Sequence, residues 1–162
     1  MNMRIVVMGV SGCGKSTVGQ QLAAALDARF VDGDDLHPPA NKSKMAAGIP
    51  LNDSDRWPWL DLVGAELAKG ETIVACSALK VAYRDRISAA AQGTFFVHLA
   101  GSRELLEQRM RSRTNHFMPA SLLDSQLATL EQLGADENGA VFDIATPPTQ
   151  LVEQIAARLR GK

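Results

Sequence analysis

The sequence predicts an α/β protein, with one five-stranded parallel sheet between two layers of helices. Short apolar runs alternate with segments whose apolar residues recur every three or four positions, as in strands joined by helices. The first run, 5–8, leads directly into a glycine-rich segment, 9–16. A length of 162 residues without internal repeats or low-complexity linkers suits a single domain spanning residues 1–162.

The first half of the chain predicts two strands and two helices around polar turns. Asp53 and Asp55 in the first turn of the second helix complement the helix dipole. A polar, proline-containing segment, 36–50, follows the second strand. The elements are strands over 5–8 and 29–31, a helix carrying Val18, Leu22, Ala25 and Leu26, and a helix over 53–69 with Leu60, Val63 and Leu67 on one face.

The second half continues the alternation. Ser102 and Thr146 are predicted to cap helices, while Pro119 and Pro147 are predicted to begin them. The elements are strands over 72–76, 94–99 and 140–144, a helix over 80–91, and helices carrying Leu105, Leu106 and Met110, then Leu122, Leu123, Leu127 and Leu130, then Val152, Ile155 and Leu159. Ligands of such a sheet gather where its strands end, which selects 9–16, 32–35, 76–77, 100–101 and 145–146.

The segment after the first strand has the spacing G-x-x-x-x-G-K-[ST] of a phosphate-binding loop. Its backbone amides and the start of the following helix favour phosphate oxygens. We expect Lys15 to contact the outer phosphates and the Ser16 hydroxyl to ligate Mg²⁺. The residues expected to bind nucleotide are Gly9, Val10, Ser11, Gly12, Cys13, Gly14, Lys15, Ser16 and Thr17.

Three carboxylates follow the second strand, in Asp32-Gly33-Asp34-Asp35. Phosphoryl transfer needs a carboxylate that accepts the proton of the acceptor hydroxyl, and Asp34 is our candidate. Asp32, closer to the strand, suits a water-mediated contact with Mg²⁺. The alternative is an ordinary Asp/Gly turn between two elements.

Further polar residues are candidates for an acceptor site. Arg56 and Arg84 would suit an acceptor that carries a carboxylate, provided that they converge. Alternatively, Arg56 forms an exposed pair with Asp53. Arg109, Arg111 and Arg113 predict a lid at about 110–120 that closes over the transferring phosphate, with a solvated helix end as the alternative.

Composition limits the possible partners and location. The net charge of −1 and pI near 6.3 give no overall field for nucleic acid or a membrane surface. No apolar run is long enough for a membrane span, and residues 1–8 carry no secretory pattern, so we expect a cytoplasmic protein. Cys13 and Cys76 do not form a metal-like pair.

The sequence resembles bacterial gluconate kinases (gluconokinases), in the shikimate-kinase-like group of small P-loop kinases, over nearly its whole length. Asp35 and Ala40 depart from the residues usual in that family. The segments 37–60 and 76–85 carry the resemblance most specifically. The matching residues are 9–16, 32–38, Asn41, Lys44-Met45, Gly48, 50–53, 55–56, 58–60, 76–80, 83–85, Arg113, His116-Phe117 and 134–137.

The resemblance implies a three-layer α/β/α P-loop kinase fold with a helical lid, often as a homodimer. It implies Mg²⁺-assisted transfer from ATP to D-gluconate, giving 6-phospho-D-gluconate. By resemblance, Lys15, Asp34 and Arg113 act in catalysis and Arg109 binds nucleotide. Acceptor contacts are expected from Asp34, His37, Lys44, Arg56, Ser77 and Arg84. Ser77-Ala78 replaces the glycine-rich loop of shikimate kinases, which argues against shikimate.

Other functions remain open at this point. A regulatory GTPase lacks support because Asp61-Leu62-Val63-Gly64 lies in a helical pattern and Asn41-Lys42 does not follow a late strand. A non-catalytic nucleotide-binding module disagrees with the retained Lys15, Ser16 and Asp34. A kinase for another sugar acid, shikimate or a nucleoside monophosphate is the nearest alternative.

Overall fold

The computed structural model describes residues 3–10, 12–111 and 120–161. The strands are β1 (Arg4–Met8), β2 (Arg29–Asp32), β3 (Thr72–Ala75), β4 (Phe95–Ala100) and β5 (Gly139–Asp143). The helices are α1 (Lys15–Leu26), the 3-10 turn η1 (Gly33–Leu36), α2 (Pro39–Ala46), α3 (Asp53–Ala68), α4 (Val81–Ala90), α5 (Arg103–Arg111), α6 (Ala120–Thr129) and α7 (Pro148–Arg160).

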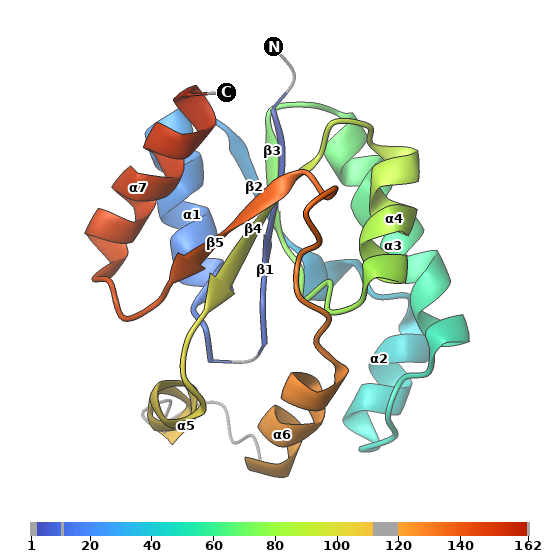
Figure 1. Ribbon diagram of the computed structural model, residues 1–162. Coiled ribbons are helices and arrows are strands. Elements are labelled where there is room, and N and C mark those ends of the chain that lie inside the picture. The colour runs from blue at the N-terminus through green and yellow to red at the C-terminus, as the bar shows by residue number, and fades with distance from the viewer. Residues whose placement is uncertain (1–2, 11, 112–119, 162) are drawn as a thin grey trace.

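The fold has the three layers that the sequence predicts (Figure 1). The strands pair in the order β2-β3-β1-β4-β5, and every pairing in the described part of the chain is parallel. Helices α1 and α7 cover one face of the sheet, and α3 and α4 cover the other (Figure 1). All strands therefore end at the same edge, beside α2, α5 and α6 (Figure 1).

The central strand β1 is buried on both faces. Ile5 and Val7 pack into the core shared with α1 and α7, whereas Val6 and Met8 pack into the core shared with α3 and α4. A strand covered on both sides reads as a continuous apolar run rather than an alternating one. This is why 5–8 could be recognised from the sequence.

Polar side chains cap the first turns of α3 and α5. The Asn52 side chain accepts from the Asp55 amide at 2.9 Å, and the Asp55 carboxylate accepts from the Asn52 amide at 3.0 Å, which is a reciprocal capping box. The Ser102 hydroxyl accepts from the Leu105 amide at 3.1 Å, so the predicted cap of α5 is confirmed.

One helix was not predicted and one predicted cap is wrong. The polar segment 36–50 contains α2, over Pro39–Ala46. This helix is short and polar, so it lacks the apolar stripe on which recognition from sequence depends. Thr146 does not cap the last helix, since α7 begins at Pro148 with Pro147 in the cap position and without a side-chain cap bond.

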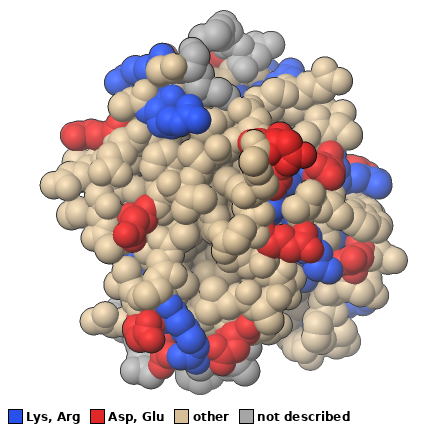
Figure 2. Space-filling view, viewed as in Figure 1, with Lys and Arg blue, Asp and Glu red and all other residues tan. Residues whose placement is uncertain are grey.

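The surface carries charges of both signs. Acidic and basic side chains are interspersed on the face shown in Figure 2, consistent with a net charge of −1. Within the described ranges, no helix combines the length and apolar character that crossing a membrane requires.

Candidate active site

The phosphate loop leaves β1 and ends in α1. Gly9 has a φ of +145°, and a Cβ there would lie 2.7 Å from the Leu99 carbonyl oxygen, so only glycine fits without a shift. The Lys15 ammonium donates to the Val10 carbonyl at 3.2 Å, which folds the side chain back over the loop. The other residues predicted to bind nucleotide differ in exposure: Val10, Gly12 and Cys13 are buried, whereas Thr17 is exposed. Gly14 is the N-cap of α1. Ser11 lies outside the described residues.

Ser16 and Asp32 bring two hard oxygen groups together beside this loop. The Ser16 hydroxyl donates to the Asp32 carboxylate at 3.4 Å. No group of three or more His, Cys, Asp or Glu side chains in the described part of the chain forms a metal site by itself. Mg²⁺ in nucleotide sites takes one or two protein oxygens and completes its shell with phosphates and water. The chemistry of Ser16 and Asp32 fits that ion.

Asp34 projects from the η1 turn at the end of β2. Its amide donates to the Asp32 carboxylate at 3.0 Å, and the preceding Gly33 packs so closely that a Cβ would lie 2.5 Å from the Ala75 carbonyl oxygen. Burial of the carboxyl group raises its pKa, and the negative charge of Asp32 adds to this, while Lys15 opposes it and Asp35 contributes a smaller rise. A raised pKa makes the Asp34 carboxylate a better proton acceptor.

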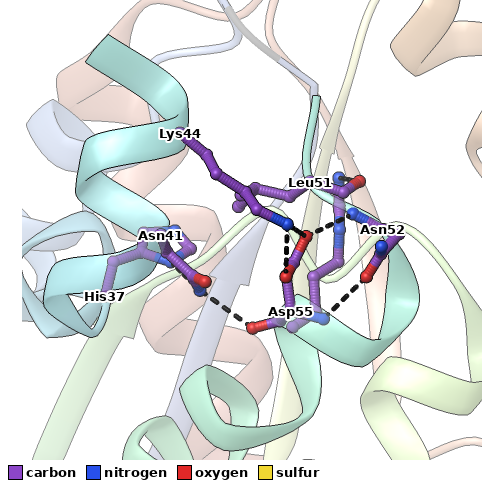
Figure 3. A network of polar contacts seen from close by, with 7 residues as sticks. His37, Asn41, Lys44, Leu51, Asn52 and Asp55 are labelled. Atoms are coloured by element: carbon purple, nitrogen blue, oxygen red, sulfur yellow. Dashed lines mark hydrogen bonds and ion pairs between the residues drawn. The ribbon is translucent and has the colours of Figure 1, made fainter. Parts of the chain in front are cut away.

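His37 is held in a neutral state. Its ring stacks on Trp59 with centroids 4.1 Å apart, and its Nδ1 lies 3.1 Å from the Asn41 amide nitrogen. Burial lowers the pKa of His37 to about 4, with smaller contributions from the charges of Arg56 and Lys42. The Asn41 amide nitrogen donates toward His37 and to the Asp55 carbonyl, so the imidazole proton belongs on Nε2 (Figure 3).

Lys44 lies on α2 and is paired within the protein. Its ammonium donates to both carboxylate oxygens of Asp55 at 2.9 Å (Figure 3). Asp55 also forms the capping box of α3, so this pair joins α2 to α3. Lys44 is partly exposed, and a ligand hydroxyl could share its remaining donor.

Arg56 does not form the pair with Asp53 that the sequence left open. Instead, the Asp53 carboxylate accepts from the Tyr83 hydroxyl at 2.5 Å and from Lys80 at 3.4 Å. The Arg56 guanidinium lies 5.4 Å from the centre of the Tyr83 ring and donates to the Leu51 carbonyl at 3.3 Å. Its Nε is fully buried and has no hydrogen-bond partner among the described residues, so a ligand would reach Arg56 through the terminal nitrogens of its partly exposed guanidinium.

Arg84 is paired within the protein, which does not favour its predicted role as a direct ligand of the acceptor. Its side chain is 1% exposed and is paired with Glu137 through Nε at 2.6 Å and Nη2 at 3.1 Å. Nη1 donates to the Ala78 carbonyl at 2.8 Å, and Nη2 also donates to a carbonyl of the segment after α6. The guanidinium is enclosed by protein groups and does not converge with Arg56 on an open pocket.

The remaining candidates fall near the phosphate loop or outside the described residues. The Ser77 carbonyl accepts from the Gly9 amide at 3.3 Å, so the loop after β3 touches the phosphate loop. Arg109 donates to the Ile144 carbonyl at 2.6 Å, beside the loop between β5 and α7. Arg113 and most of the predicted lid lie outside the described residues.

Comparisons with known proteins agree with this geometry. The family model described as shikimate kinase matches residues 11–158. A probable gluconokinase of Xenopus tropicalis is 43% identical, with 99% of this chain and 95% of that protein covered. The chain belongs to the gluconokinase family. The gluconokinase crystal structure from Sinorhizobium meliloti 1021 is 49% identical, with a TM-score of 0.89 over 96% of this chain and 90% of that one.

The gluconokinase family thus shares its fold with a wider group of kinases. The shikimate kinase of Aquifex aeolicus has a TM-score of 0.62 at 18% identity over 98% of this chain and 97% of that one, which supports the common fold alone. The P-loop kinase fold that the sequence predicts is confirmed.

Several residues of this gluconokinase-family site received no role from sequence reasoning. Asn41, Trp59 and Tyr83 stood among the matching residues, but their contacts depend on how α2, α3 and α4 meet. His37 precedes α2 with extended backbone, so its contact with Asn41 could not be inferred from helical spacing. For Glu137, the sequence carried no signal that it would meet Arg84.

Proposed function

We propose that this protein transfers the γ-phosphoryl group of ATP to D-gluconate, giving 6-phospho-D-gluconate and ADP. The observation that carries the proposal is that Asp32 connects Asp34 to the phosphate loop, because its carboxylate accepts from the Ser16 hydroxyl at 3.4 Å and from the Asp34 amide at 3.0 Å. A phosphate-loop lysine beside a basic carboxylate pairs a donor site with a proton acceptor. Membership of the gluconokinase family supports the choice of acceptor.

On the nucleotide side, the amides of the phosphate loop and Lys15 hold the outer phosphates of ATP. Arg109 lies beside the loop that follows β5, where it would contact the nucleotide. Ser16, and Asp32 through water, would hold Mg²⁺, which supplies charge neutralisation on the phosphates when bound. Arg113 would stabilise the transferring phosphoryl group from the lid.

On the acceptor side, Asp34 accepts the proton of the attacking hydroxyl. Gluconate is a polyol with one carboxylate, and the partly exposed Arg56 is our candidate to bind that carboxylate. Neutral His37 and partly exposed Lys44 would contact the other hydroxyls, and Ser77 would border the acceptor next to the phosphate loop. By resemblance to its family, we further propose a cytoplasmic location and a homodimer. Light scattering after gel filtration would test the homodimer.

The proposed function is tested by coupled ADP release with a panel of acceptors. The panel contains D-gluconate, other aldonates, shikimate and nucleoside monophosphates, each over a range of concentrations. We expect kcat/KM for gluconate to exceed that of every other acceptor by about tenfold or more. A strong rate with another acceptor and none with gluconate would overturn the substrate assignment but leave the kinase assignment intact.

A further inference from the structure

The loop over residues 77–79 is fastened by three separate segments. Its consecutive carbonyls accept, in chain order, from the Gly9 amide at 3.3 Å, the Arg84 guanidinium at 2.8 Å and the Glu131 amide at 2.7 Å. The first partner belongs to the phosphate loop, the second to α4, and the third to the segment that follows α6. This loop therefore connects the phosphate loop with α4 and with the segment after α6.

The loop holds a conformation that its residues do not favour. Ala78 has a φ of +45°, in the left-handed region, and its side chain is fully buried. Such a conformation is unfavourable for a residue with a Cβ and persists where the surroundings fix it. The hydrogen bond from Arg84 to the Ala78 carbonyl is one of the contacts that fix it.

Arg84 is itself fixed by Glu137. The two side chains form a bidentate pair, and the second Glu137 oxygen also accepts from the Gly134 amide at 2.7 Å. Burial alone would raise the pKa of Glu137, but hydrogen bonds from Arg84 and the Gly134 amide, together with the charge of Arg84, lower it overall. Removing either partner leaves a buried charge without compensation, which costs more than a surface pair.

We propose that Arg84 and Glu137 are positioning residues that set acceptor affinity by holding Ala78, without touching the acceptor. The inference rests on the proposed function, because the acceptor must bind beside the loop 77–79. Loss of the pair would let the loop relax and would misplace the acceptor relative to Asp34. The phosphate loop keeps its own internal contacts, so ATP binding should change little.

The test compares steady-state constants of Glu137→Gln, Arg84→Lys and wild-type protein with gluconate and ATP. Arg86→Gln is the matched control, because Arg86 lies on the same helix but pairs with Asp61 at the exposed surface. Thermal unfolding of every variant is recorded beside the kinetics. We expect gluconate KM to rise about tenfold in Glu137→Gln and Arg84→Lys, with ATP KM changed less than about twofold. Arg86→Gln should match wild type.

Glu137→Gln distinguishes positioning from direct contact. If Arg84 bound the acceptor carboxylate, removing the competing Glu137 charge would leave gluconate KM unchanged or lower it, and that result overturns the proposal. A lower unfolding temperature with both KM values unchanged, or an equal rise of both, also overturns it. Should Arg84→Lys fail to fold, Glu137→Gln decides alone. If wild type prefers another acceptor, the proposed function fails, and the same comparison with that acceptor still tests the pair.

Discussion

The indole Nε1 of Trp59 donates a 2.8 Å hydrogen bond to the Gly33 carbonyl. The same indole stacks on His37, so one buried side chain of α3 supports both the turn that carries Asp34 and a proposed acceptor ligand. This contact links the stability of the fold to the geometry of the site.

Trp59→Phe keeps an aromatic ring but removes the donor to Gly33. We expect the free energy of unfolding to fall by about 1–3 kcal/mol, because a buried carbonyl loses its partner. We also expect kcat to fall, since Asp34 follows Gly33 directly. Urea unfolding and steady-state kinetics check this. Trp57→Phe is the control, because Trp57 is half-buried and meets Tyr83 edge-on; equal losses in both variants would contradict the account.

Asp34→Asn should lower kcat by about a hundredfold or more, while the dissociation constant of ATP stays within about twofold. The amide cannot accept the proton of the acceptor hydroxyl, but it leaves the phosphate loop unchanged. Initial rates and nucleotide titration measure the two effects. Asp35→Asn, at the next residue of the same turn, should retain most of the rate. An Asp34→Asn enzyme with normal turnover would remove Asp34 from catalysis.

Much of this could be predicted from the sequence because strong local signals agreed. The buried strands are continuous apolar runs, and the phosphate loop has a fixed spacing. Ser102 caps α5 as its position suggests. The polar helix α2 gave no such signal, since its stability comes from contacts such as Asn41 with Asp55 rather than from an apolar face. Tertiary contacts of this kind leave no periodic pattern in the sequence.

His37 should make the fold sensitive to acid between pH 6.5 and about 4. Its pKa is about 4 in the folded protein and near 6.5 when unfolded, so the unfolded chain binds more protons over this interval. The contribution is complete above pH 6.5 and is lost as pH falls, at up to about 1.4 kcal/mol per pH unit. Urea unfolding across this range should show a shallower slope in His37→Phe, which keeps a ring on Trp59. Parallel slopes would contradict the assignment.

Arg56→Ala should raise gluconate KM by about tenfold or more and leave ATP KM nearly unchanged. Arg56 is partly exposed and donates to the Leu51 carbonyl through one terminal nitrogen only, so its guanidinium can still bind an acceptor carboxylate. Steady-state kinetics with each substrate varied in turn provide the comparison. Arg29→Ala is the control. Arg29 is the first residue of β2, at the end of the strand away from the candidate site, and it pairs with Glu66. An unchanged gluconate KM would place Arg56 outside the site.

The two arginines show where sequence reasoning about the site reached its limit. Both follow polar turns, and both suited a carboxylate ligand equally well. Burial separates them, because Arg84 is enclosed and paired with a residue more than fifty positions away, whereas Arg56 retains an unused donor. Which arginine meets Glu137 depends on the path of the segment after α6, and no local pattern specifies that path.

Product identification tests the central claim most directly. The protein is incubated with ATP, Mg²⁺ and D-gluconate, and the mixture is followed by ³¹P and ¹³C nuclear magnetic resonance. We predict a new phosphomonoester signal coupled to the C6 position of gluconate, growing in step with ADP. ADP formation accompanied by inorganic phosphate alone, or no reaction with gluconate, would contradict the account.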